Sequence, residues 1–139
     1  RHTLALIGLD RIIGRAGRRA RDEWQAEFGE LERVEQVSVD DVASGTERTV
    51  IDVRGGAEWE EGHLPNARHY FLGDLIRKAR DLPHDTPIAV HCHGGTRASV
   101  AASLLQAQGF TNVANISGGY RAWTEAKLPV EHDEAPADV

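Results

Sequence analysis

The chain has 139 residues, of which 40% are hydrophobic and 27% are charged, and these values fit a globular domain with one core. The net charge of -6 argues against a nucleic-acid-binding protein, and the absence of a long apolar run argues against a membrane protein. The single cysteine leaves no internal disulfide and the sequence has no signal-peptide pattern, so we expect a cytoplasmic protein.

Charge divides the chain into parts. Residues 11–21 contain five arginines and no acid, and we interpret them as a solvated face. Residues 131–139 contain four acids and no Lys or Arg, which predicts an acidic, disordered tail. Residues 36–130 carry the patterns of regular structure and are predicted to form the domain, so residues 1–35 become an N-terminal extension.

Strand and helix patterns alternate along the predicted domain. In chain order they predict a helix over 38–45, a strand over 49–56, a helix over 72–83, a strand over 87–92, a helix over 96–109, a strand over 111–119 and a helix over 118–127. Ser38 is the expected N-cap of the first helix. This alternation predicts an α/β fold with a mostly parallel sheet that is covered on both faces.

The helices also predict which residues are buried. In the helix over 72–83 one stripe holds Leu72, Leu75, Ile76, Ala79 and Leu82. In the helix over 96–109 the residues in register are Val100, Ser103, Leu104 and Ala107, with Gly109 after the helix end. Trp59 and Trp123 are expected in the core.

The start of the chain faintly resembles a later segment. Residues 5–13 resemble residues 107–116, and a tryptophan follows each of them (Trp24 and Trp123). We therefore expect residues 1–35 to be the tail of an earlier, similar module, and the absence of methionine fits a piece of a longer protein. The gaps between the matching elements differ, so chance similarity is the alternative.

The only cysteine lies in the stretch "HCHGGTRAS", residues 91–99. Cys92 ends a predicted strand, at the edge where open α/β sheets bind their ligands. Gly94 and Gly95 permit a tight turn into the next helix, whose unpaired N–H groups favour an anion such as a thiolate. Arg97 adds a permanent positive charge. The pattern predicts Cys92 as a nucleophile, and the alternative is a small buried residue.

A metal site at this cysteine is not predicted. His91 and His93 flank Cys92, but alternation along a strand directs Cys92 away from both histidines. No Cys or His pair at ligand spacing occurs elsewhere in the chain.

The segment "CHGGTR" (92–97) resembles the six-residue C-x-x-G-x-R active-site loop of rhodanese-like sulfurtransferases. Two flanking stretches agree, "VIDVRGGAEWEEGHLPNARHY" (50–70) and "ISGGYRAWTEAKLPV" (116–130). The resemblance covers residues 36–130 in order. It implies a rhodanese fold, with a central five-stranded, mostly parallel sheet and helices on both faces.

The resemblance implies sulfur transfer through a persulfide on Cys92. The donor would be a small anionic compound, thiosulfate or a low-molecular-weight persulfide, and the acceptor a thiol or cyanide. No cofactor is implied. The persulfide would be held by the loop residues that follow the cysteine: His93, Gly94, Gly95, Thr96 and Arg97.

Loop length separates this hypothesis from a related one. Cysteine-dependent phosphatases and arsenate reductases use a loop one residue longer, whereas here four residues separate Cys92 from Arg97. A non-enzymatic module for interaction or regulation is a further alternative, although such modules usually lose the cysteine. His93 stands where thiosulfate-using members often have arginine, which leaves the donor open.

The N-terminal extension, residues 1–35, suggests one more partner. Residues 1–35 resemble what precedes the last rhodanese unit in fusions with a metallo-β-lactamase-like persulfide dioxygenase. On that reading an upstream domain of this kind, or an acceptor protein, would be the partner, and a glutathione-type persulfide would be the donor or product.

Three further residues are candidates for supporting roles. Asp52 and Arg54 end the strand beside the cysteine loop. Arg54 could guide an anionic donor, but an ion pair with Glu58 or Glu61 is the favoured interpretation. His63 is interpreted as a structural hydrogen-bonding residue and not as a general base.

Overall fold

The computed structural model of the chain describes residues 15–30 and 33–133. The chain divides into two compact units, Arg1–Arg33 and Val34–Val139, and each is described by itself. The segment 5–13, which carries the internal echo, lies outside the described residues. No helix in the described part of the chain is long and apolar enough to cross a membrane.

The first unit contains helix α2 (Arg18–Phe28), which starts after Gly17 and buries none of its residues. Arg19 pairs with Glu23 one turn later at 2.8 Å, and both side chains are well exposed. The described part of the arginine-rich run, residues 15–21, is exposed throughout, as a solvated face requires.

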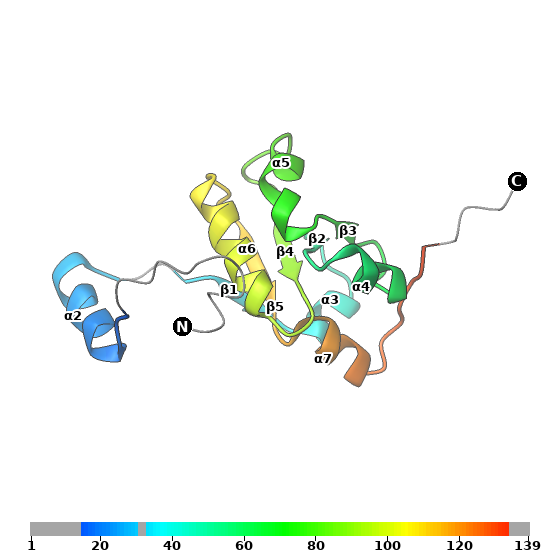
Figure 1. Cartoon of the computed structure of the whole chain (residues 1–139), viewed down its shortest axis with the longest axis horizontal. Coiled ribbons are helices and arrows are strands. Elements are labelled where there is room, and N and C mark those ends of the chain that lie inside the picture. The colour runs from blue at the N-terminus through cyan, green and yellow to red at the C-terminus, as the bar shows by residue number, and fades with distance from the viewer. Residues whose placement is uncertain (1–14, 31–32, 134–139) are drawn as a thin grey trace, which may run out of the picture. The chain divides into compact units, whose positions relative to one another are not determined.

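The second unit contains a five-stranded sheet, and every strand pairing in it is parallel (Figure 1). Its strands are β1 (Glu35–Val37), β2 (Thr49–Asp52), β3 (Arg68–His69), β4 (Ile88–His91) and β5 (Val113–Ile116). The spatial order is β1-β5-β4-β2-β3, with β4 at the centre. This sheet confirms the predicted fold class.

Helices cover both faces of this sheet (Figure 1). They are α3 (Val39–Ala43), α4 (Gly56–Glu61), η1 (Leu72–Asp74), α5 (Leu75–Ala79), α6 (Thr96–Ala107) and α7 (Gly119–Glu125). One buried cluster joins α5 and α6 to the sheet, and a second cluster joins α3 and α7 to the opposite face. Because the central strands are covered on both faces, all four residues of β4 and of β5 are buried.

The chain uses the expected cap at the start of α3. The Asp41 N–H donates to Ser38 Oγ at 3.0 Å, and the Ser38 N–H donates back to Asp41 Oδ2 at 3.2 Å. This reciprocal pair satisfies two N–H groups that the helix itself leaves free. The short helix therefore has a fixed start, directly after β1.

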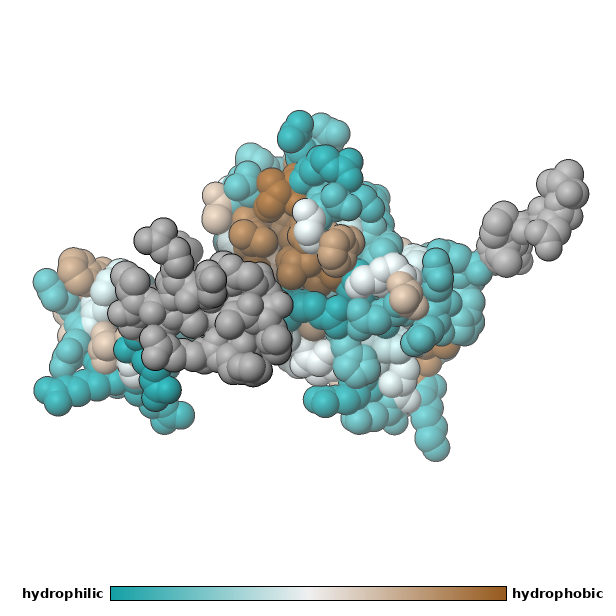
Figure 2. All heavy atoms as spheres, viewed as in Figure 1, coloured by the Kyte–Doolittle hydropathy of each residue, from teal (hydrophilic) through white to brown (hydrophobic). Residues whose placement is uncertain are grey.

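The buried face of α6 differs from the prediction. Val100 and Leu104 are 50% and 39% exposed, and the buried residues of the helix are Ala98, Ala101, Ala102 and Leu105. Figure 2 shows apolar surface over the region of α5 and α6. Three alanines let the helix backbone approach the sheet closely, so small side chains and not the larger apolar ones mark its inner face.

The start of the predicted disordered tail packs on the domain. The His63 and Glu131 backbones exchange two hydrogen bonds, of 2.9 and 2.8 Å. The Asp133 carboxylate accepts a hydrogen bond from Trp59 Nε1 and lies 3.2 Å from His63 Nε2. Residues 131–133 are therefore held by specific contacts, which corrects the prediction for them, and 134–139 lie outside the described residues.

Two adjacent leucines test the orientation of α6. Leu105→Ala removes a side chain with no exposed surface and should lower the free energy of unfolding by about 2–4 kcal/mol. Leu104→Ala is the matched control and should change it by less than about 1 kcal/mol. Urea denaturation followed by circular dichroism gives both values, and a larger loss for Leu104→Ala would contradict the orientation of the helix.

Candidate functional site

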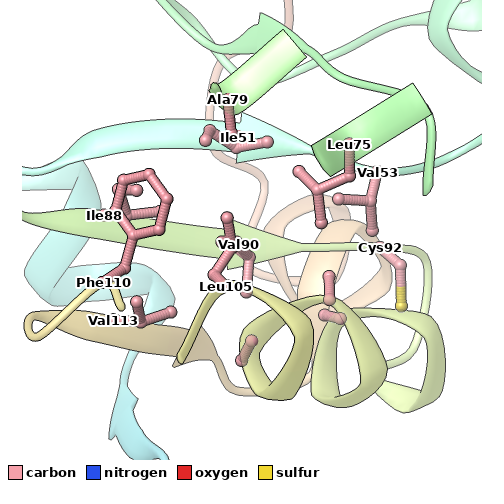
Figure 3. Packing of buried hydrophobic residues seen from close by; sticks show 13 residues of the cluster. Ile51, Val53, Leu75, Ala79, Ile88, Val90, Cys92, Leu105, Phe110 and Val113 are labelled. Carbon is pink, nitrogen blue, oxygen red and sulfur yellow. The ribbon is translucent and has the colours of Figure 1, made fainter. Parts of the chain in front are cut away.

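Cys92 follows the last residue of the central strand β4 and is 2% exposed. Its side chain belongs to the buried cluster on the α5–α6 side of the sheet. Figure 3 shows its sulfur at the end of that cluster, directed toward the helix ribbon beside it. The residue thus meets the core on one side and the start of α6 on the other.

The loop after Cys92 turns the chain into α6 within three residues. Gly95 is the N-cap of α6 and has a φ of 119°, a conformation that side chains rarely adopt. This geometry directs the Gly95 N–H to Cys92 Sγ, at 3.1 Å. Thr96 is the first residue of the helix, and nothing lies within 4 Å of the position that a Cβ on Gly94 would take. A backbone donor therefore faces the sulfur at the positive end of a helix.

Backbone N–H groups at the start of α7 hydrogen-bond to the carbonyl groups of the cysteine loop. The Tyr120 N–H donates to the Cys92 carbonyl at 2.8 Å, and the Arg121 N–H donates to the His93 carbonyl at 3.0 Å. Gly119 has a φ of 57°, and a Cβ there would collide with the Cys92 carbonyl oxygen and lie 2.9 Å from that of His93. Only glycine lets the two backbones approach this closely.

Arg97 is held beside the cysteine by Glu58, the third residue of α4. Its Nη1 and Nη2 donate to the two carboxylate oxygens at 2.7 and 2.8 Å. The hydrogen bonds from Arg97 lower the pKa of Glu58 to about 2, so the carboxylate stays charged at neutral pH. The Glu58 carboxylate and the nearby Cys92 raise the pKa of Arg97. The bidentate geometry fixes a permanent cation next to the sulfur.

Arg54 does not pair with Glu58 or Glu61, contrary to the favoured interpretation. Its Nε and Nη2 donate to the Asp52 carboxylate at 2.7–3.0 Å, and Nη2 also donates to the Gly62 carbonyl. Arg54 is 2% exposed and its guanidinium lies 4.0 Å from the Tyr120 ring centroid. Arg54 pairs with Asp52 because a fully buried carboxylate needs a cation beside it. Glu58 is already bound to Arg97. Arg54 is not placed to guide a donor in solution.

His91 is the third member of this buried group. Its Nδ1 donates to the Cys92 carbonyl at 3.2 Å, and its Nε2 lies 3.6 Å from Asp52 Oδ2, too far for a hydrogen bond. Among the described residues Nε2 has no hydrogen-bond partner. Burial lowers the pKa of His91 below 6.5, and the Asp52 carboxylate opposes this only in part. The ring is therefore neutral at pH 7.

The remaining predicted residues lie at the periphery. His93 is exposed at the rim of the loop, with its ring centroid 6.5 Å from that of Tyr120. His63 is buried, stacks on Trp59 at 3.6 Å between ring centroids, and hydrogen-bonds to the Leu64 carbonyl. These contacts support a structural role for His63. Within residues 15–30 and 33–133, no group of three His, Cys, Asp or Glu side chains is placed to hold a metal ion.

These features define an α/β protein with a cysteine loop built to stabilise a negative charge on sulfur. The chain belongs to the rhodanese-like domain family, whose model matches residues 36–126. A putative sulfur carrier protein, YrkF from Bacillus subtilis, is 36% identical over 83 residues, which are 60% of this chain and 45% of that protein. The chain thus spans less than half the length of that relative.

Two more comparisons agree. The thiosulfate sulfurtransferase GlpE from Vibrio cholerae is 32% identical over 82 residues, 59% of this chain and 77% of that protein. The solution structure of the rhodanese-like domain of the Alr3790 protein from Anabaena matches with a TM-score of 0.67 and 27% identity, covering 77% of this chain and 88% of that domain. These similarities support a role in the sulfurtransferase family.

Two residues of this site were not assigned their roles from the sequence. Glu58 was considered as a partner of Arg54 and is instead the partner of Arg97, 39 residues away. Gly119 lies in the overlap between the strand predicted over 111–119 and the helix predicted over 118–127, and no role of its own was predicted for it. The sequence signal for Gly119 was the adjacent pair Gly118–Gly119, which marks a turn, and in the structure both glycines have a positive φ.

Gly119→Ala should lower the free energy of unfolding by about 2 kcal/mol or more, because the new methyl group meets two backbone carbonyls at a positive φ. Gly56→Ala in α4 is the control, since nothing lies within 4 Å of its added Cβ. Thermal and urea denaturation measure both variants. Equal stabilities would contradict the close contact between α7 and the cysteine loop.

His91 should make stability fall on mild acidification. Below pH 6.5 the unfolded chain protonates this histidine while the folded chain resists it, so unfolding is favoured as pH drops, by up to about 1.4 kcal/mol per pH unit. His91→Phe should remove this part of the slope between pH 6.5 and 5, while the exposed-residue control His84→Gln should keep it. An unchanged slope in His91→Phe would contradict a buried neutral imidazole.

Proposed function

We propose that the chain is a sulfurtransferase that moves a sulfane sulfur from a donor to a thiophilic acceptor through a persulfide on Cys92. The observation that carries this proposal is the Gly95 N–H at 3.1 Å from Cys92 Sγ, with the Arg97 cation held beside it. Such a site stabilises the thiolate before the reaction and the persulfide after it.

The donor step balances without any cofactor. The Cys92 thiolate attacks the outer sulfur of thiosulfate, the sulfur–sulfur bond of the donor breaks, and sulfite leaves with the electron pair. The product is Cys92–S–S⁻. With a low-molecular-weight persulfide as the donor, the leaving group is the corresponding thiolate. In each case negative charge moves outward by one sulfur atom, within reach of the same backbone donors.

The acceptor step returns the enzyme to its starting state. A thiolate or cyanide attacks the outer sulfur of the persulfide, the bond to Cys92 Sγ breaks, and Sγ takes the electron pair. Cyanide gives thiocyanate, and a thiolate gives a new persulfide. The loop that stabilised Cys92–S–S⁻ then stabilises the departing Cys92 thiolate, so one set of donors serves both half-reactions.

The arginine favours sulfur over phosphate as the transferred group. The edge of the guanidinium formed by Nη1 and Nη2 is occupied by both oxygens of Glu58. A phosphoryl dianion would have to compete with this carboxylate for the same bidentate face. The four-residue spacing from Cys92 to Arg97 supports the same choice.

The relatives support the proposal at the level of the family. GlpE carries the name of a thiosulfate sulfurtransferase and YrkF that of a putative sulfur carrier. His93 is exposed at the loop rim and supplies a cation only when it is protonated, so thiosulfate and a less charged persulfide are both donors to be tested.

Intact-mass analysis tests the proposal. After incubation with thiosulfate or with glutathione persulfide, the protein should gain about 32 Da, the mass of one sulfur atom, and lose it on addition of cyanide. Cys92→Ser should show no gain. Because the chain has no other cysteine, the wild-type adduct can be assigned to Cys92 without digestion. No adduct from either donor, or an equal adduct on Cys92→Ser, would overturn the proposal.

A further inference from the structure

An open cleft of about 600 Å³ adjoins the cysteine loop, between α6 and the β1 edge of the sheet. Gly94 and Gly95 of the loop line one end of it, and Gln36 and Asn115 line the strand side. None of the residues that line it carries a charged side chain. The charged side chains of this site, Arg97 and Glu58, are not among the residues that line the cleft, so the cleft is polar but neutral.

The cleft lies on the same face of the sheet as the reactive sulfur. Asn115 of β5 is in register with Val90 of β4, and Val90 and Cys92 both belong to the cluster on the α5–α6 side. Alternate residues of a strand share a face, so Asn115 and Cys92 face the same helix layer. Cys92 is two residues further toward the carboxyl end of the sheet, and it precedes Gly94 and Gly95, which line the loop end of the cleft.

The floor of the cleft has an unused hydrogen-bond acceptor. Asn115 is 6% exposed, and its Nδ2 donates to Gln36 Oε1 at 3.2 Å. Ser117 Oγ donates to the same oxygen at 3.3 Å. Asn115 Oδ1 has no partner among the described residues. A buried carbonyl oxygen left without a donor is unfavourable, so this atom favours a ligand that brings an N–H group.

We propose that this cleft binds the amide-bearing body of a small peptide-type thiol, whose sulfur is thereby placed to accept the sulfane sulfur from Cys92. The proposal rests on the sulfurtransferase function proposed above and names the class of its acceptor. An amide N–H of the ligand would donate to Asn115 Oδ1, and the rim hydroxyl of Ser117 and the backbone at the loop glycines would meet its carbonyl oxygens. Val100, half exposed on α6, supplies apolar contact for the ligand stem.

The transfer that follows is balanced by the two thiols alone. The acceptor thiolate RS⁻ attacks the outer sulfur of Cys92–S–S⁻, the bond to Sγ breaks, and Cys92 leaves as the thiolate. The acceptor becomes the persulfide anion RSS⁻, so no external oxidant or reductant is needed. The cleft contributes position and not charge, because its lining is uncharged and the charge that develops stays in the loop.

Val100→Trp tests the cleft by filling it. Val100 lines the cleft and is 50% exposed on α6, so a larger side chain there should leave the fold intact. Cys92 is loaded with thiosulfate and discharged with glutathione, 2-mercaptoethanol or cyanide. We expect kcat/KM for glutathione to fall about tenfold, while the values for 2-mercaptoethanol and cyanide change by less than about twofold. Leu104→Trp, one turn further along the same exposed face and outside the cleft, is the matched control and should change none of them.

A second variant removes the acceptor atom and keeps the size of the side chain. Asn115→Leu should lower kcat/KM for glutathione about fivefold, with little effect on cyanide, and the exposed Gln108→Leu should have no effect. Equal losses with all three acceptors, or no loss with glutathione in Val100→Trp, would overturn the cleft. A higher kcat/KM of the wild-type protein for 2-mercaptoethanol than for glutathione would also overturn the cleft. Absence of any Cys92-dependent transfer to cyanide would instead overturn the sulfurtransferase function itself.

Discussion

The contact between the start of α7 and the backbone of Cys92 and His93 determines the geometry of the site. Both carbonyl oxygens of these residues accept hydrogen bonds from α7. In a trans peptide the C=O and the following N–H point in opposite directions, so fixing the two carbonyls toward α7 turns the N–H groups of His93 and Gly94 away from it. The close approach requires Gly119, and the loop would lose its orientation without it. The anion-binding arrangement is thus imposed from the far side of the loop.

Arg54 and Arg97 have different roles near the cysteine because their carboxylate partners, Asp52 and Glu58, differ in burial. Arg54 and Asp52 are both almost fully buried, and with His91 they form a layer under the loop that has no access to a donor in solution. Arg97 and Glu58 are each more than a third exposed in their side chains, so their charge is available beside the sulfur. Because it is buried, the first pair supports β2 and β4, whereas the second pair is partly exposed and lies beside the cysteine loop.

Much of this arrangement could be predicted from the sequence, and the limits have physical causes. The strands β2, β4 and β5 stand out as short β-branched or apolar runs, and Cys92, Gly95 and Arg97 are local in sequence, so their spacing carries the signal. The strands β1 and β3 have only three and two residues, too few to show a periodicity. The buried face of α6 was predicted wrongly because its alanines are weakly apolar while Val100 and Leu104 are strongly so. Which carboxylate each of Arg54 and Arg97 pairs with depends on distances in the folded chain. A single sequence gives no information on those distances.

In the proposed reaction, the cysteine loop and the cleft recognise different parts of the substrate, and they do so independently. The loop binds whatever charge develops on sulfur, and this part is common to every donor and acceptor in the proposed reaction. In the proposed reaction the neutral cleft meets only the body of the acceptor, so its side chains add selectivity without changing the charge at Cys92. Because Val100 and Gln36 are exposed, substitutions there cost the core little. Acceptor preference can therefore change through the cleft while the sulfur chemistry of the loop stays the same.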